Sequence, residues 1–259
     1  MGLFNLAETR LSDLEARVAA LEGTVIPTPT PPVAAITSLQ AAIDATPAGG
    51  ELVVPAGSYS PVVIPRAMTI RGPLDAVIDG GDVAVKPCSG LQWYGFTWKN
   101  QATAGMYRDA ALENILVDGT HGDNFGDFMI HLSGGWKNVT FRNLTGANAK
   151  GTHYPSHILY LKTGSGFAIE DCDLGRCYGP GGEVGCIQIG YGVSNGQILR
   201  NRVHDSPYGI IIWGNSSGAT HDIVCSGNVG SNNGTDFYEY GANIQNITWD
   251  AGTKVVRAQ

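Results

Sequence analysis

The stretch Ile115-Leu116-Val117-Asp118-Gly119 decides the fold, because its form returns four more times along the chain. Each copy is a short strand-like triplet followed by a polar corner. The last members of the triplets step by 24, 28, 30 and 26 residues. A repeat of roughly 20 to 50 residues with no helical pattern between its copies indicates a solenoid. The five triplets are Ile115-Leu116-Val117, Val139-Thr140-Phe141, Phe167-Ala168-Ile169, Gln197-Ile198-Leu199 and Ile223-Val224-Cys225.

A second set of triplets lies between the first ones and keeps the same period. Its last members step by 29, 28 and 23 residues. Two ladders in phase predict an all-β fold, a right-handed parallel β-helix, whereas a β-sandwich would need antiparallel hairpins. Equivalent positions of a solenoid lie above one another. We therefore expect one inward column of Val117, Phe141, Ile169, Leu199 and Cys225, and another of Leu132, Leu161, Ile189 and Ile212.

Residues 36–259 are expected to form this β-helix, with a short helix at its N-terminal end. Thr37 or Ser38 can cap that helix, and Pro47-Ala48-Gly49-Gly50 ends it. Strand-like apolar runs follow at 52–54, 62–64, 68–70 and 76–78. Glycine, proline, serine and aspartate separate these runs, as is typical of strands joined by tight corners.

Residues 1–25 carry the heptad pattern of a coiled coil, with apolar side chains at alternating steps of three and four. Arg10 precedes Glu15 and Arg17 precedes Glu22 by five positions, which favours parallel strands. The windows 10–15 and 17–22 resemble the Arg-h-x-x-h-Glu pattern of short trimeric coiled coils, where h is apolar. We expect a homotrimer held through Phe4, Ala7, Arg10, Leu11, Leu14, Glu15, Arg17, Val18, Leu21, Glu22 and Val25.

Two alternatives to this trimer stay open at the level of sequence. Valine and leucine at successive core positions lean toward two strands, and an amphipathic helix could instead dock on its own domain. The prolines between residues 27 and 32 cannot continue a helix, since proline lacks an amide proton. Residues 26–35 are therefore interpreted as an extended, proline-rich linker.

The composition argues against several classes of protein. No run approaches the roughly 18 consecutive apolar residues of a membrane span, so we expect no membrane insertion. The formal charge of -7 becomes -21 in a trimer (3 × -7), which opposes binding to nucleic acid. The five cysteines are an odd number without a CxxC pair, and we expect them to be reduced and buried. We expect no secretory signal, metal or cofactor.

Two segments resemble the pectate-lyase-like β-helix superfamily. Residues 38–44 followed by Gly50-Glu51-Leu52-Val53-Val54-Pro55-Ala56-Gly57-Ser58-Tyr59 are similar to its entry, a capping helix and a first strand. Leu91 to Asn100 looks like a common coil of the same superfamily. A trimeric coiled coil before such a β-helix is the layout of phage tailspikes, tail fibres and minor tail proteins, and the short stalk resembles tail proteins of actinobacterial phages.

The resemblance implies where a site would lie. Enzymes of the superfamily act on polysaccharides along an outer face, with carboxylates as acid and base or with basic residues. On the second ladder, the residues between the inward pairs are His131, Tyr160, Gln188 and Ile211. His131 and Tyr160 are the candidate acid/base pair. The candidate glycan contacts are Asp127, His131, His157, Tyr160 and Lys162.

Two loops are further candidate binding segments. Residues 118–127 are rich in aspartate and could bind a cation, but a polar corner explains the same residues. Residues 146–157 form a longer loop that could bind a ligand or fill a groove between protomers. No two carboxylates fall at matching positions on adjacent coils, which disfavours cleavage.

The expected function is therefore that of a trimeric phage tail protein in the virion, with structural and host-recognition roles. Its expected partners are other tail proteins and a bacterial surface glycan. The alternative is a polysaccharide depolymerase, either a lyase or a glycoside hydrolase, and an adhesin or secreted lyase is a third hypothesis.

Overall fold

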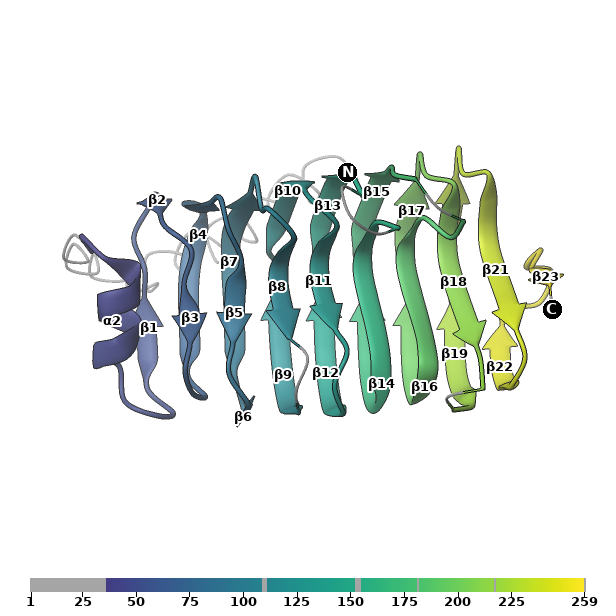
Figure 1. The fold of residues 1–259 in the computed structure, drawn as a ribbon, viewed down its shortest axis with the longest axis horizontal. Coiled ribbons are helices and arrows are strands. Elements are labelled where there is room, and N and C mark those ends of the chain that lie inside the picture. Colours follow the sequence, from purple (N-terminus) through teal and green to yellow (C-terminus); the bar gives the residue numbers. More distant parts are fainter. Residues whose placement is uncertain (1–35, 109–110, 152–154, 181, 217, 259) are drawn as a thin grey trace, which may run out of the picture. The chain divides into compact units, whose positions relative to one another are not determined.

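The computed structural model describes residues 36–108, 111–151, 155–180, 182–216 and 218–258. Within them the chain winds into a right-handed parallel β-solenoid of about seven turns. Figure 1 shows the coils side by side, in sequence order from purple to yellow. The predicted coiled coil and linker, residues 1–35, lie outside the described residues and stay predictions.

Strands on three faces form each complete coil, and every pair of neighbouring strands is parallel. The first face continues from coil to coil through the triplets around Val117, and the third face through those around Leu132. The first face contains β1 (Glu51–Val53), β6 (Cys88–Ser89), β9 (Leu112–Asp118), β12 (Trp136–Arg142), β19 (Thr220–Ser226) and β22 (Ile244–Trp249). The third face contains β3 (Val63–Ile64), β5 (Val83–Val85), β8 (Ala104–Arg108), β11 (Phe128–Leu132), β18 (Tyr208–Gly214), β21 (Thr235–Gly241) and β23 (Val256–Ala258).

Four long strands turn a corner and so belong to two faces. β4 (Thr69–Asp79) and β7 (Gln92–Lys99) run from the first face onto the second, while β14 (His157–Glu170) and β16 (Gly185–Leu199) run from the third face onto the first face of the next coil. The second face otherwise consists of short strands. These are β2 (Gly57–Tyr59), β10 (His121–Phe125), β13 (Thr145–Ala149), β15 (Asp173–Cys177), β17 (Arg202–His204) and β20 (Val229–Ser231).

The second face corrects one expectation, since residues 118–127 were interpreted as a corner loop. His121–Phe125 is instead strand β10, which pairs with β7 and β13. Left-handed residues such as Asn124 and Asn148 within these short strands gave them the composition of turns. Two ladders were predicted, and the structure has three.

The inward column of the first face confirms four of its five predicted members. Val117 pairs with Phe141, Phe141 with Ile169, and all are fully buried, as is Cys225 at 2% exposure. The prediction of Leu199 as the inward residue is wrong by one position. The residue between Ile169 and Cys225 is Ile198, which is 0% exposed.

A corner residue explains the error. At this corner the left-handed residue is Arg200, with φ of 57°, although arginine rarely takes that conformation. The neighbouring Asn201 looked like the corner but is 1% exposed and hydrogen-bonds inside the column. The left-handed corner therefore falls at the first residue of the polar pair Arg200-Asn201, whereas in the two preceding coils it falls at the second residue, Asn143 or Asp171.

The inward column of the third face is confirmed in full. Leu132, Leu161, Ile189 and Ile212 are in register on successive coils, and each is at most 1% exposed. Residues on either side of these positions point away from the core. The register thus fixes which side chains form the outer surface of this face.

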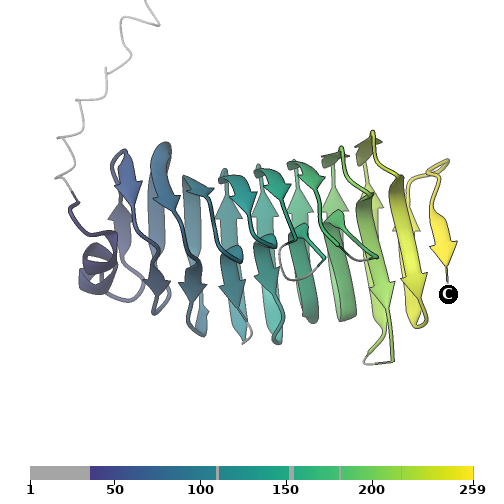
Figure 2. The same cartoon turned by 45° about the horizontal axis from the view of Figure 1, so that its top comes forward.

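Helix α2 (Leu39–Ala45) covers the N-terminal end of the solenoid, next to β1 (Figures 1 and 2). The Ser38 side chain accepts a hydrogen bond from Ala41 N, which confirms one of the two predicted caps. Gln40 exchanges hydrogen bonds of 2.7 and 3.0 Å with the backbone of Val63. Its amide therefore occupies the place of a neighbouring strand on the open edge of β3.

Cys172, Cys177, Cys186 and Cys225 are buried free thiols, as predicted, while Cys88 is partly exposed. No helix in the described ranges is long and apolar enough to cross a membrane.

Candidate functional site

The outward positions of the third face line up as the sequence predicted. His131 lies beside Tyr107 on one side and Tyr160 on the other, and Tyr160 lies beside Gln188. Gln188 in turn pairs with Ile211. The exposure of these positions differs along the row, because Gln188 and Ile211 are 1% and 0% exposed.

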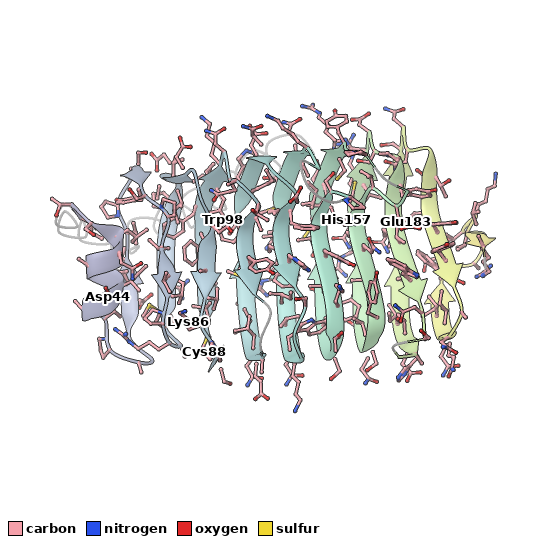
Figure 3. The ribbon with its side chains drawn as sticks, viewed as in Figure 1. Asp44, Lys86, Cys88, Trp98, His157 and Glu183 are labelled. Carbon is pink, nitrogen blue, oxygen red and sulfur yellow. The ribbon has the colours of Figure 1, made fainter. Side chains whose placement is uncertain are left out.

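A pocket of about 520 Å³ opens over this row of residues. Figure 3 labels His157 and Glu183, two of its lining residues, over neighbouring coils. The pocket draws its lining from β8, β11, β14, β16 and β18 and from the segments between strands. Its aromatic residues are Tyr107, Phe128, His131, Tyr160, Tyr191 and Trp213, and its polar side chains include His157, Lys162, Glu183 and Gln188.

The rings on one side of the pocket form a continuous row of aromatic contacts. The His131 and Tyr160 rings are almost parallel, at 12°, with centroids 4.9 Å apart. Phe128 lies 4.6 Å from His131 and 5.6 Å from Tyr160, and Tyr107 meets His131 edge-on at 5.2 Å. One coil spacing of about 4.8 Å brings such rings into contact without distorting the strands.

The other side of the pocket combines aromatic rings with a cation. Tyr191 and Trp213 meet edge-on with centroids 4.6 Å apart. The Lys162 ammonium lies 4.4 Å from the Tyr191 ring centroid and 5.6 Å from that of Tyr160. The Lys162 ammonium therefore already occupies the position over the Tyr191 and Tyr160 rings at which an external cation would bind.

His157 is a neutral base in this site. It is 2% exposed, and burial lowers its pKa to about 3. Its Nδ1 lies 3.3 Å from Gly185 N, and a side-chain hydrogen bond joins it to Gln188. At neutral pH this imidazole has no charge to offer a ligand.

Tyr160 is held in its protonated form. Burial raises the pKa of its hydroxyl, and the neighbouring Tyr191 and Glu183 raise it further. A hydrogen bond also joins the side chains of Tyr160 and Tyr191. The phenol can therefore donate a hydrogen bond but is poorly suited to act as a base.

The structure brings together four of the five predicted contact residues, namely His131, His157, Tyr160 and Lys162. Asp127 is the exception. Its side chain is 0% exposed and does not line the pocket, and its backbone carbonyl accepts a hydrogen bond from His157 N. A direct contact between this carboxylate and a ligand is not available.

Sequence reasoning missed several lining residues. Tyr107 was overlooked because Arg108 stands where an apolar strand residue was expected, and Glu183 because it precedes β16 in a segment without periodicity. Tyr191 lies two positions after the inward Ile189, whereas Trp213 lies one position after the inward Ile212, so no common offset from the column predicted them.

The acidic residues of the 118–127 segment interact with neighbouring side chains. Asp118 accepts hydrogen bonds from Arg142 at 2.9 Å and Asn143 at 2.7 Å, and Asp123 accepts one from Asn148 at 2.6 Å. In the part of the chain that the structure describes, no group of three or more His, Cys, Asp or Glu residues is arranged to hold a metal ion.

No protein-family model matches the chain, and neither a curated protein nor a solved structure matches it. The parallel β-solenoid is consistent with a β-helix superfamily.

Proposed function

We propose that the pocket on the third face binds a bacterial surface glycan, and that the chain serves as a trimeric host-recognition component of a phage tail. The observation that supports glycan binding is the aromatic pocket itself. Sugar rings present C–H faces that pack on aromatic rings, and polar groups at the margin set their orientation. The stacked wall of Phe128, His131 and Tyr160 and the edge formed by Tyr191 and Trp213 supply such surfaces.

The tail assignment rests on the sequence. It is supported by the heptads of residues 1–25, the proline-rich linker and the resemblance to phage tail proteins. Weak binding at each pocket is compatible with this role, because several linked copies can raise avidity by roughly 10² to 10⁴.

The alternative is a depolymerase, and one observation favours it. Glu183 lies in the same pocket as His131 and Tyr160, so a carboxylate and two other polar groups share one cavity. Hydrolysis in most glycosidases needs two carboxylates, and Glu183 is the one carboxylate among the described lining residues. His157 is buried and neutral, and Tyr160 is held protonated. We therefore propose binding without cleavage.

Binding can be tested with purified cell-wall and capsular glycans of candidate host bacteria in calorimetry. We expect Tyr191→Ala to weaken binding, because it removes one aromatic edge of the pocket. Tyr94→Ala is the matched control, since Tyr94 lies on the first face and outside the pocket. Full binding by Tyr191→Ala, or no binding by the unmodified protein to any of these glycans, would contradict the proposal.

Cleavage is tested in the same samples by following reducing ends and the absorbance of unsaturated uronates. We expect neither to rise. Sustained product that disappears in His131→Ala or Tyr160→Phe would favour the depolymerase. Product that survives both substitutions would place catalysis elsewhere on the chain.

A further inference from the structure

Gln188 is an unusual residue for the floor of a pocket. It occupies an outward position of β16, between Tyr160 and Ile211, yet it is only 1% exposed. Its Nε2 atom is buried and has no hydrogen-bond partner within the described part of the chain. A buried N–H group without an acceptor is unfavourable, so a position of this kind calls for an oxygen atom from outside the protein.

The orientation of this amide follows from its neighbour. A side-chain hydrogen bond joins His157 and Gln188, and because Gln188 Nε2 has no partner, the amide oxygen is the atom that His157 contacts. His157 Nδ1 lies 3.3 Å from both Gly185 N and Gly185 O, and donation from Nε2 to the Gln188 amide oxygen selects the tautomer in which Nδ1 accepts from Gly185 N–H. The amide oxygen is thereby occupied, and the amide N–H group is left for a ligand.

The side chains around Gln188 determine which hydrogen-bond acceptor can bind its Nε2–H group. Phe128 and Tyr160 make the nearby wall apolar, and Phe128 is only 4% exposed. His157 offers no positive charge at the floor, while Glu183 lines the same pocket and would repel a ligand carboxylate. A cationic ligand would meet Lys162 over the Tyr191 ring. The acceptor that suits this environment is a neutral carbonyl oxygen attached to a small apolar group.

We propose that Gln188 selects glycans with N-acetylated amino sugars, its Nε2–H group donating to the acetamido carbonyl oxygen while the methyl group packs on the aromatic wall. This proposal rests on the glycan-binding function argued above and specifies the class of sugar. It makes Gln188 a specificity-determining residue.

Two neutral tetrasaccharides with the same β-1,4 linkage test the proposal, one of N-acetylglucosamine and one of glucose. They differ at the C2 substituent, which is acetamido in one and hydroxyl in the other. Because one hydrogen bond and one apolar contact distinguish them, we expect the full-length protein to bind the acetamido tetramer roughly tenfold more tightly or better. A tetramer of galacturonic acid should bind more weakly than the acetamido tetramer.

Two variants test whether Gln188 causes the preference for the acetamido tetramer. Gln188→Met keeps the length of the side chain but removes the donor, and should reduce the preference for the acetamido tetramer to within about threefold. Gln197→Met, on an exposed position of the first face, is the matched control and should keep the preference. Thermal melting of each variant establishes that it is folded, and the comparison of tetramers on the unmodified protein does not depend on any variant.

The outcomes separate the two proposals. Binding of host glycans together with equal or weaker affinity for the acetamido tetramer overturns the role of Gln188 and leaves glycan binding standing. A preference that persists unchanged in a folded Gln188→Met protein also overturns it. Failure to bind any glycan removes both proposals.

Discussion

At the scale of single residues, the corners of the solenoid depend on side chains that tolerate a left-handed backbone. Asparagine provides many of them, including Asn114, Asn138 and Asn143, each with φ of 53 or 54°. Asparagine reaches this conformation at lower cost than most residues. Its amide also bonds to the next coil, as when Asn138 Nδ2 donates to Asn114 Oδ1 at 3.1 Å.

Asn201 has a different role, because its side chain satisfies backbone groups inside the column. Its Oδ1 accepts from Cys172 N at 3.0 Å and its Nδ2 donates to Ile169 O at 2.9 Å. Asn201→Ala leaves both buried groups without these partners, and we expect a loss of about 1–3 kcal/mol in the free energy of unfolding. Denaturant titration measures this loss.

The control for this prediction is Gln197→Ala, which alters an exposed side chain of the same coil and should change stability by less than about 0.5 kcal/mol. Equal stability of the Asn201→Ala and Gln197→Ala proteins would show that the amide contacts contribute nothing.

His157 makes stability depend on pH. Its folded pKa of about 3 lies below the value of 6.5 for an exposed histidine, so the unfolded chain binds the proton more readily. The contribution of the neutral His157 to the free energy of unfolding is fully present above pH 6.5. It falls as the pH drops toward 3, with a slope of up to about 1.4 kcal/mol per pH unit. Denaturation at pH 7, 6 and 5 measures that slope.

We expect His157→Gln to flatten the slope between pH 6.5 and about 4.5, above the range in which carboxylates titrate. An unchanged slope in this variant would mean that other groups cause the acid sensitivity. The matched substitution His221→Gln, on the first face, should leave the slope largely intact.

The residues of the site were only partly predictable from sequence. The period of the third face placed His131, Tyr160 and Gln188 in one row, because alternation along a strand fixes which side chains point outward. It could not show that Gln188 is buried, since that depends on how segments between the strands cover the row. Glu183 lies in such a segment, where no repeat constrains its position.

At the scale of elements, the register of β16 is the sharpest test of the fold. A shift of one residue exchanges the inner and outer sides of a strand. Ile198→Ala should cost about 2–5 kcal/mol because it leaves a cavity between Ile169 and Cys225. Leu199→Ala, at a partly exposed neighbouring position, should cost less than half as much.

Denaturant titration of the two variants decides the register. A larger loss for Leu199→Ala than for Ile198→Ala would restore the register expected from sequence alone.

The faces of the solenoid differed in how well the sequence predicted them. The first and third faces use β-branched and aromatic residues at strict alternation, a pattern typical of strands. The second face uses short strands such as Thr145–Ala149, in which glycine, alanine and asparagine dominate. Coil-to-coil pairing, rather than local preference, makes these residues extended, and a single sequence does not reveal such pairing.

At the scale of the whole molecule, we expect a homotrimer of about 82 kDa (3 × 27.3 kDa) in light scattering. The heptads of residues 1–25 are best satisfied in a parallel bundle. Replacing Leu14 and Leu21 by serine should shift the mass toward that of the monomer, because both lie on the predicted seam. Replacing Asp13 and Ala20, which lie off the predicted seam, by serine is the control. A monomeric unmodified protein at micromolar concentration would contradict the prediction.

The regular spacing of the coils has a consequence for how the chain is made in a cell. Paired residues of the first column, from Val117 to Cys225, are separated by 24, 28, 29 and 27 positions. Ribosomes add roughly 5 to 20 residues per second, so each coil emerges within a few seconds of the previous one. We expect the nascent chain to wind progressively from its capped end, each finished coil serving as the template for the next.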